Sequence, residues 1–185
     1  MSTAPTLERR WTAEEYDALD DRERYELVDG QLLERNMSLF SGEAAARIIA
    51  VLGAFARRHH LGRVFGSEPG LRINPRDPEH TRRADAAFIS YARSPESDTG
   101  YLRVAPELVV EVVSPGDTAS AVRAKVDEWL AHGVRMVWLA YPDVREVHVY
   151  AQGLHPQIFT ADDEITAGDI LPGFSSPVAE LFPER

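Results

Sequence analysis

The run ELVVEVV, residues 107–113, most constrains what this chain can fold into. It is short, almost wholly apolar and rich in valine, so it predicts a strand in the interior of a sheet. Glu111 stands among its core residues, and a buried carboxylate is costly unless it is paired or binds a metal. The run therefore predicts a central strand whose one acid has a partner.

The rest of the chain alternates strand-like and helix-like segments. Thr12 and Glu15 form a capping box for a short helix over 13–20, and Asp29-Gly30 is the dipeptide of a tight hairpin turn. Further strands are predicted over 63–69, 70–74, 84–90, 135–141 and 146–151. Long helices are predicted over 42–60, capped by Ser41, and from Asp117 or Thr118 to about His132, with a last helical turn in 171–182. These elements imply one α/β or α+β domain over 1–185, with a mixed sheet flanked by helices.

Composition narrows the classes of function. The 185 residues, 44% of them hydrophobic, suit one domain, and the absence of cysteine excludes disulfides and thiolate metal sites. The net charge of −10 opposes nucleic acid binding unless one face is basic, for which 56–60 and 81–83 are candidates. Both basic stretches are equally well read as solvated surface. We find no apolar signal core and expect no transmembrane segment, so the expected location is cytoplasmic.

Two carboxylates on neighbouring predicted strands suggest a metal site. Asp85 begins the apolar strand 84–90, and Glu111 lies in the strand 107–113. Their mutual repulsion would be relieved by a divalent cation, and oxygen ligands suit Mg²⁺ or Mn²⁺. In the alternative, Asp85 caps a turn and Glu111 pairs with an arginine.

Lys125 is the only lysine in a chain with nineteen arginines. On its predicted helix it lies at the edge of the buried stripe, from which its side chain can extend toward the end of strand 107–113. A compact ammonium can reach a single oxygen and shift its pKa, which guanidinium does not do. The alternative is chance, since a single lysine must fall somewhere.

Several motifs together resemble one family. They are YELVDGQL (25–32), ADAAFIS (84–90), PELVVEVVSPGD (106–117), the lysine at 125, GVRMVWLAYPDVREVHVY (133–150) and LPGF (171–174). In this order they resemble the Uma-two family of restriction endonucleases, within the PD-(D/E)xK nuclease superfamily. The resemblance implies a restriction-endonuclease-like core with an N-terminal hairpin.

The resemblance also implies roles for particular residues. Asp85 and Glu111 match the metal ligands, to which the backbone carbonyl of Val113 could add an oxygen. Lys125 looks like the superfamily's catalytic lysine, relocated to the helix because Val113 occupies its usual place. Glu26 matches the acidic residue of the hairpin and would complete the acidic cluster, unless it simply pairs with Arg24 or Arg35.

The chain departs from the family pattern in two places. The proline usual before the aspartate is Ala84 here. Relatives often carry a histidine near the start of the long helix, where Ser41 or Glu43 is the nearest polar residue. Asp117 is read as a helix cap rather than a catalytic residue.

The resemblance predicts a Mg²⁺- or Mn²⁺-dependent endonuclease that hydrolyses phosphodiester bonds, with DNA as the expected partner and a homodimer as a candidate assembly. The alternative is a catalytically silent relative that keeps the fold and acts as a binding or regulatory module. The sequence contains no P-loop, dinucleotide glycine fingerprint, nucleophile elbow or HExxH motif that would favour another enzyme class.

Overall fold

A six-stranded mixed sheet organises the molecule in the computed structural model, which describes residues 9–36, 38–77, 79–95 and 100–184. Its strand order is β3-β4-β5-β6-β7-β8, and only β5 and β6 pair in parallel. The strands are β3 (Gly62–Phe65), β4 (Ala86–Ser90), β5 (Leu108–Val112), β6 (Met136–Tyr141), β7 (Glu146–Ala151) and β8 (Gln157–Phe159). The central place of β5 confirms the prediction made from its valine-rich run.

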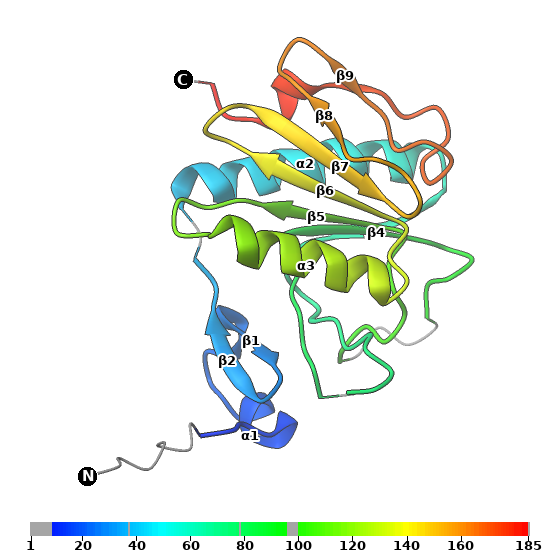
Figure 1. Ribbon diagram of the computed structural model, residues 1–185. Helices are drawn as coiled ribbons and strands as arrows, with labels where there is room; N and C mark the ends of the chain where they lie inside the picture. The colour runs from blue at the N-terminus through cyan, green and yellow to red at the C-terminus, as the bar shows by residue number, and fades with distance from the viewer. Residues whose placement is uncertain (1–8, 37, 78, 96–99, 185) are drawn as a thin grey trace.

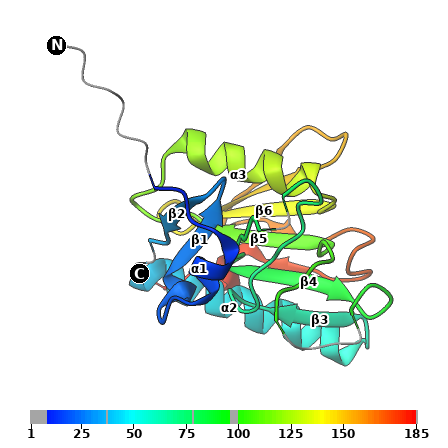
Figure 2. The same cartoon turned by 90° about the horizontal axis from the view of Figure 1, so that it is seen from below.

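Two helices cover opposite faces of this sheet, α2 (Leu39–Arg58) and α3 (Ala119–Ala131) (Figures 1 and 2). Because side chains alternate along a strand, Val110 of β5 packs in the core beneath α2, while Val109 packs in the core beneath α3. The C-terminal segment, with η2 (Val178–Leu181), joins the α2 core. The result is a mixed α/β fold, as predicted.

A separate N-terminal unit lies beside the main sheet. It contains α1 (Ala13–Asp17), η1 (Arg22–Arg24) and the hairpin of β1 (Tyr25–Val28) and β2 (Gln31–Glu34). The hairpin turns at Asp29 and Gly30, both with positive φ as a type I′ turn requires. Backbone hydrogen bonds between Leu27 and Thr81 in both directions, of 3.0 and 2.8 Å, join the hairpin to the segment that precedes β4.

Some expected boundaries were wrong. Ser38 rather than Ser41 caps α2. Of the two caps left open for α3, Asp117 and Thr118, it is Thr118 that caps the helix. Residues 70–74 form isolated bridges at Leu71 instead of a strand. The short strands β8, β9 (Glu164–Ile165) and β10 (Ser176–Pro177) were not predicted, because segments of two or three residues carry almost no periodic signal.

One expectation about the surface also needs correction. Arg82 and Arg83 are not solvated: the Arg82 side chain is 11% exposed and that of Arg83 is 1% exposed. By length and composition α2 could cross a membrane. In this fold, however, its Ile48 and Leu52 are fully buried against the sheet, as in the core helix of a globular domain.

Candidate active site

The pleat of β5 aims Glu111 toward α3. Glu111 is two residues from Val109 and so lies on the same face of the sheet, the one that α3 covers. On α3, Val126 and Trp129 are buried against this face, and Lys125 lies beside them with its side chain 21% exposed. The predicted reach of Lys125 from the edge of the helix stripe to strand β5 is therefore confirmed.

The ammonium of Lys125 joins two acids from different parts of the chain. Its Nζ lies 2.8 Å from Oε2 of Glu111 and 3.1 Å from Oε1 of Glu26. The indole N–H of Trp129 donates to the other oxygen of Glu111 at 2.8 Å. Glu111 thus pairs with a lysine and a tryptophan, and not with an arginine as the alternative reading had it.

Asp85 lies in the same cavity, held by the chain on two sides. Its Oδ1 accepts from Arg35 at 2.8 Å, and its Oδ2 accepts the backbone N–H of Val112 at 2.8 Å. Asp85 therefore ties the start of β4 to the end of β5 instead of capping a turn. Together with Glu26, Glu111, Lys125, Val113 and other residues it lines a cavity of about 380 Å³.

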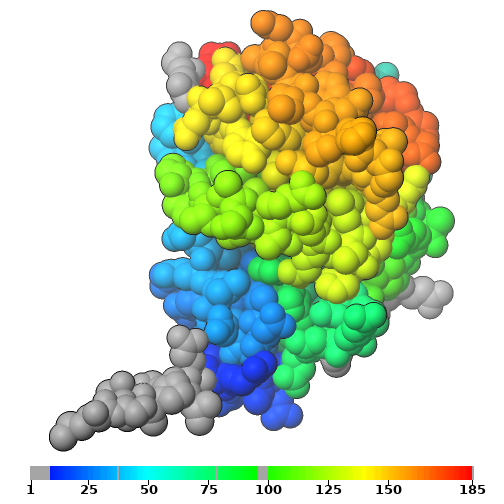
Figure 3. Space-filling model, viewed as in Figure 1, coloured from blue at the N-terminus to red at the C-terminus, as the bar shows by residue number. Residues whose placement is uncertain are grey.

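Glu26 belongs to a wider ionic network. It accepts from the backbone N–H of Arg83 at 2.7 Å and from the guanidinium of Arg82 at 3.0 Å, so its partners are neither Arg24 nor Arg35. Arg82 also donates to Glu128 on α3. The hairpin that carries Glu26 and the helix that carries Lys125 meet on the face shown in Figure 3.

Burial and charge give these groups unusual acidities. Burial raises the pKa of Glu111 to about 7; Lys125 opposes that rise, while the nearby Asp85 and Glu26 add to it. Burial would also raise the pKa of Glu26, but Lys125 and Arg82 lower it. Burial would lower the pKa of Lys125, but Glu111, Glu26 and Asp85 raise it. A lysine held charged among three acids, one of them reluctant to ionise, is typical of a functional cluster.

The donors of this cavity fit a divalent cation. Each carboxylate oxygen has two lone pairs, so the oxygens of Asp85 and Glu111 can accept a metal beside their present partners. A cation would also oppose the effects of burial and of the nearby Asp85 and Glu26, which together raise the pKa of Glu111. Val113 lines the cavity and donates its N–H to Ala140 at 2.9 Å. Among the described residues, however, the three acids do not form a set whose oxygens all lie within 4.8 Å of one another.

Ser41 and Glu43, the polar residues where relatives often carry a histidine, are not among the residues that line the cavity. Ser41 is buried, and its hydroxyl bonds to Ser38 at 2.8 Å and Ser114 at 2.9 Å. Glu43 pairs with Arg47 on the surface of α2. Asp117 lines the cavity and accepts the N–H of Ser114 at 2.7 Å, so it shapes the turn after β5. None of the three contacts Lys125 or Glu111 in the described structure.

Three participants were not assigned from the sequence. Arg35 holds Asp85, Trp129 holds Glu111, and Arg82 links Glu26 to Glu128. The buried side chain of Trp129 within the apolar stripe of α3 was the one available signal, because a buried indole N–H needs an acceptor. Arg35 and Arg82 carried no signal, since nothing in sequence separates a buried arginine from the many exposed ones.

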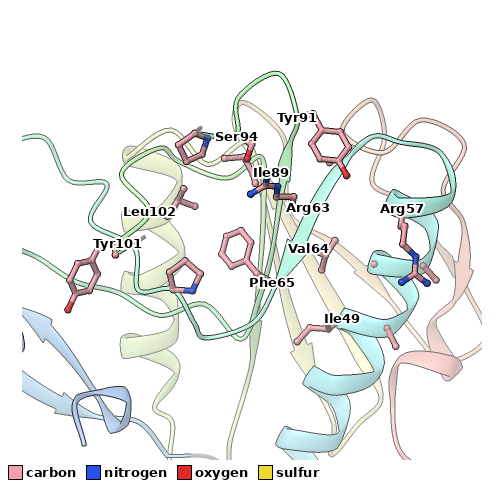
Figure 4. Close-up of a pocket in the computed structure, with 17 residues that line it drawn as sticks. Ile49, Arg57, Arg63, Val64, Phe65, Ile89, Tyr91, Ser94, Tyr101 and Leu102 are labelled. Atoms are coloured by element: carbon pink, nitrogen blue, oxygen red, sulfur yellow. The ribbon is translucent and has the colours of Figure 1, made fainter. Parts of the chain in front are cut away.

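A second cavity, larger than the acidic one, has different chemistry. It measures about 740 Å³ and lies against α2 and the edge strand β3, among Ile49, Val64, Phe65 and Ile89, with Arg57 and Arg63 at its border (Figure 4). None of the described residues that line it is a carboxylate. It therefore offers no ligand set for a hard cation, and the smaller acidic cavity is the better candidate for catalysis.

Known proteins similar to this chain match it over most of its length. A family model described as "Putative restriction endonuclease" matches residues 13–179. A solved structure from Anabaena variabilis, described as "a putative nuclease belonging to DUF820", is 21% identical and covers 92% of this chain and 97% of its own, with a TM-score of 0.78. At this identity the likeness shows a shared fold. No curated protein sequence matches the chain.

Proposed function

Because the chain belongs to the Uma2 family of restriction endonucleases, we propose that it is a single nuclease-like domain that hydrolyses phosphodiester bonds of nucleic acid, with DNA as the substrate. The observation that carries the proposal is the contact of 2.8 Å between Lys125 and Glu111, in one cavity with Asp85. Three side chains distant in sequence meet there, the two acids and the lysine that the resemblance to PD-(D/E)xK nucleases implies.

In the proposed mechanism Asp85 and Glu111 would hold one or two Mg²⁺ or Mn²⁺ ions, with the Val113 carbonyl as a further oxygen. When bound, the metal would make a coordinated water more acidic and neutralise charge on the scissile phosphate. Lys125 would donate a hydrogen bond from Nζ that orients the attacking water, or one to a phosphate oxygen as negative charge develops on that oxygen. Glu26 and Glu111 orient that ammonium, and Trp129 fixes the carboxylate of Glu111.

Plasmid cleavage tests the proposal directly. We expect nicking or linearisation with Mg²⁺, loss of cleavage with EDTA, and loss of cleavage in Lys125→Ala. The matched control is Arg123→Ala, which changes an exposed cation two residues away on the same helix and should keep activity. Thermal unfolding of both variants verifies that each is folded. Cleavage that survives both EDTA and Lys125→Ala would contradict the proposal.

One observation favours a second candidate, a catalytically silent binding module. Every carboxylate oxygen of Asp85 and Glu111 already has a hydrogen-bond partner within the chain. A Mn²⁺ titration distinguishes the two functions. An active site should bind Mn²⁺ and lose that affinity in Asp85→Ala, whereas a silent module shows no metal-dependent change at this cavity.

The proposal extends to assembly and location. We propose a homodimer, because a second copy would bring a second site to the other strand of a duplex, and a cytoplasmic protein, because the DNA proposed as its substrate would lie there. Light scattering of the purified protein gives its mass in solution, and cell fractionation gives its location. A monomeric mass at all concentrations, or recovery with membranes, would refute the respective part.

A further inference from the structure

A second group of potential metal ligands lies outside the acidic cavity, where the hairpin meets the segment before β4. One ligand atom each of Asp29, Asp77 and His80 all lie within 4.8 Å of one another. Asp29 comes from the β1–β2 turn, and the other two come from the loop that leads to Thr81. Among the described residues, no other group of three potential ligands has its ligand atoms this close together.

His80 provides an observation that does not depend on the acidic residues. Its side chain is 7% exposed, and its Nε2 lies 2.6 Å from Oε1 of Glu128. Its other ring nitrogen, Nδ1, is buried without a hydrogen-bond partner among the described atoms. A buried polar atom that lacks a partner is costly, so it indicates a missing group.

The hydrogen bond to Glu128 sets the chemistry of that nitrogen. The carboxylate of Glu128 lies 2.6 Å from Nε2 of His80 and also accepts from the guanidinium of Arg82 at 2.9 Å. Because a carboxylate paired with an arginine acts as an acceptor, Nε2 of His80 is the donor of this bond, and Nδ1 is the ring nitrogen left to bind another group. A histidine that donates one N–H to a carboxylate and offers its other nitrogen is the arrangement found around protein-bound metals.

The aspartates add negative charge that the protein leaves uncompensated. In the part of the chain that the structure describes, no ion pair engages Asp29 or Asp77. Asp77 and His80 line a cavity of about 280 Å³, whose border includes Arg10, Trp11 and Glu79. The cavity is large enough for an ion and its remaining water ligands.

We propose that Asp29, Asp77 and His80 bind a divalent transition metal, with Zn²⁺ as the best fit. One imidazole nitrogen and two carboxylates form a three-ligand set that leaves a coordination position for water. Ligand atoms around tetrahedral zinc lie roughly 3.3 Å apart, so small rotations of the exposed Asp29 side chain must close the group around the ion. The bound ion would fasten the hairpin to the loop and, through His80 and Glu128, to α3.

The experiment uses the full chain carrying Glu111→Gln, stripped of metal with EDTA and then freed of the chelator. The Glu111→Gln substitution impairs the acidic cavity. A failure to bind Zn²⁺ in this variant therefore concerns the Asp29, Asp77 and His80 site alone and is distinguishable from failure of the nuclease proposal. Competition with a chromophoric chelator should show one bound Zn²⁺. The substitutions Asp29→Asn and Asp77→Asn together should weaken binding by roughly tenfold or more, since even outer-shell partners of a metal ligand contribute that much.

These substitutions are chosen to keep the fold. Asparagine before glycine favours the type I′ turn at position 29, and at position 77 its oxygen can still accept the N–H of Glu79, now at 3.1 Å. The control, Asp20→Asn with Asp162→Asn, removes the same charge from exposed positions and should bind Zn²⁺ unchanged. The ¹⁵N signal of His80 Nδ1 should also shift on Zn²⁺ addition. No detectable Zn²⁺ binding, equal binding by the Asp29/Asp77 variant, or an unmoved His80 signal would each overturn the proposal.

Discussion

At the scale of single residues, the ammonium of Lys125 holds the acidic cavity together. It contacts Glu111 and Glu26, while Asp85 raises its pKa from nearby. A buried ion pair is weak evidence for stability as such, but removal of one partner leaves the other charge buried without compensation. The cost of losing Lys125 should therefore greatly exceed that of losing an exposed cation.

We expect Lys125→Met to lower the free energy of unfolding by about 3–5 kcal/mol, because two acids then lose their shared cation. Urea denaturation measures the change. The control is Arg123→Met, which breaks an exposed pair with Asp127 on the same helix and a cation–π contact of 5.5 Å with Tyr150, and should leave stability nearly unchanged. Equal effects of the two substitutions would show that Lys125 is not electrostatically coupled to the acids of the cavity.

Glu128 makes the free energy of unfolding depend on pH. Its pKa is about 2 in the folded protein, against an ordinary value of 4.5, because the side chains of His80 and Arg82 donate hydrogen bonds to it. Because the folded pKa lies below the ordinary one, the carboxylate stabilises the fold fully above pH 4.5, and that contribution is lost as the pH falls toward 2. The stability difference between wild type and Glu128→Gln should therefore be largest at about pH 6 and shrink through this window. Urea denaturation across the range checks this, and a difference independent of pH would contradict it.

The sequence identified some of these residues for physical reasons and could not identify others. Glu111 is conspicuous because a carboxylate in a valine run must have a partner, and Lys125 because its helix position lies within reach of that strand. The partner of Glu26 was not predictable. Arg24, Arg35 and Arg82 are chemically alike, and only the packing of the hairpin on the segment before β4 selects Arg82.

At the scale of elements, side chains at helix starts decide where helices begin. Thr118 accepts the N–H of Ala121 at 3.3 Å at the start of α3, whereas Asp117 accepts a bond inside the preceding turn. The sequence left both open because aspartate and threonine cap helices comparably well. The same ambiguity misplaced the start of α2, where Ser38 and Ser41 are both good caps in sequence.

We predict that Thr118→Ala lowers the free energy of unfolding by about 1 kcal/mol, the usual worth of a capping hydroxyl. Thr118→Ser keeps the acceptor and should retain most of that stability. Thermal or urea unfolding of the two variants gives the comparison. If alanine and serine behave alike, Asp117 acts as the cap and the described start of α3 is incorrect.

At the scale of the whole molecule, the net charge opposes the proposed function. A net charge of −10 repels a phosphate backbone, and Arg82 and Arg83 are buried, so they do not supply the basic face that nucleic acid binding would need. A cation bound among the acids would change the sign of the local field where the scissile phosphate must lie. Metal and nucleic acid should therefore bind cooperatively.

We expect the affinity for a DNA duplex to rise by roughly tenfold or more when Ca²⁺ replaces EDTA, because the ion neutralises the acidic cavity. Fluorescence anisotropy with a labelled duplex measures the change, at constant ionic strength to separate it from general screening. Asp85→Asn should abolish most of the increase. An affinity that changes neither with the ion nor with this substitution would indicate that DNA binds elsewhere or not at all.

Glu26 of the acidic cavity comes from the β1–β2 hairpin, which is not part of the six-stranded sheet. If that hairpin swung away, the sheet and its helices would stay intact while Lys125 lost one of its two anchors. Such a local opening costs less than unfolding the whole chain. The proposed activity would then be lost at a lower temperature than the fold of the sheet and helices. A heated sample whose spectrum still reports these elements would already be inactive.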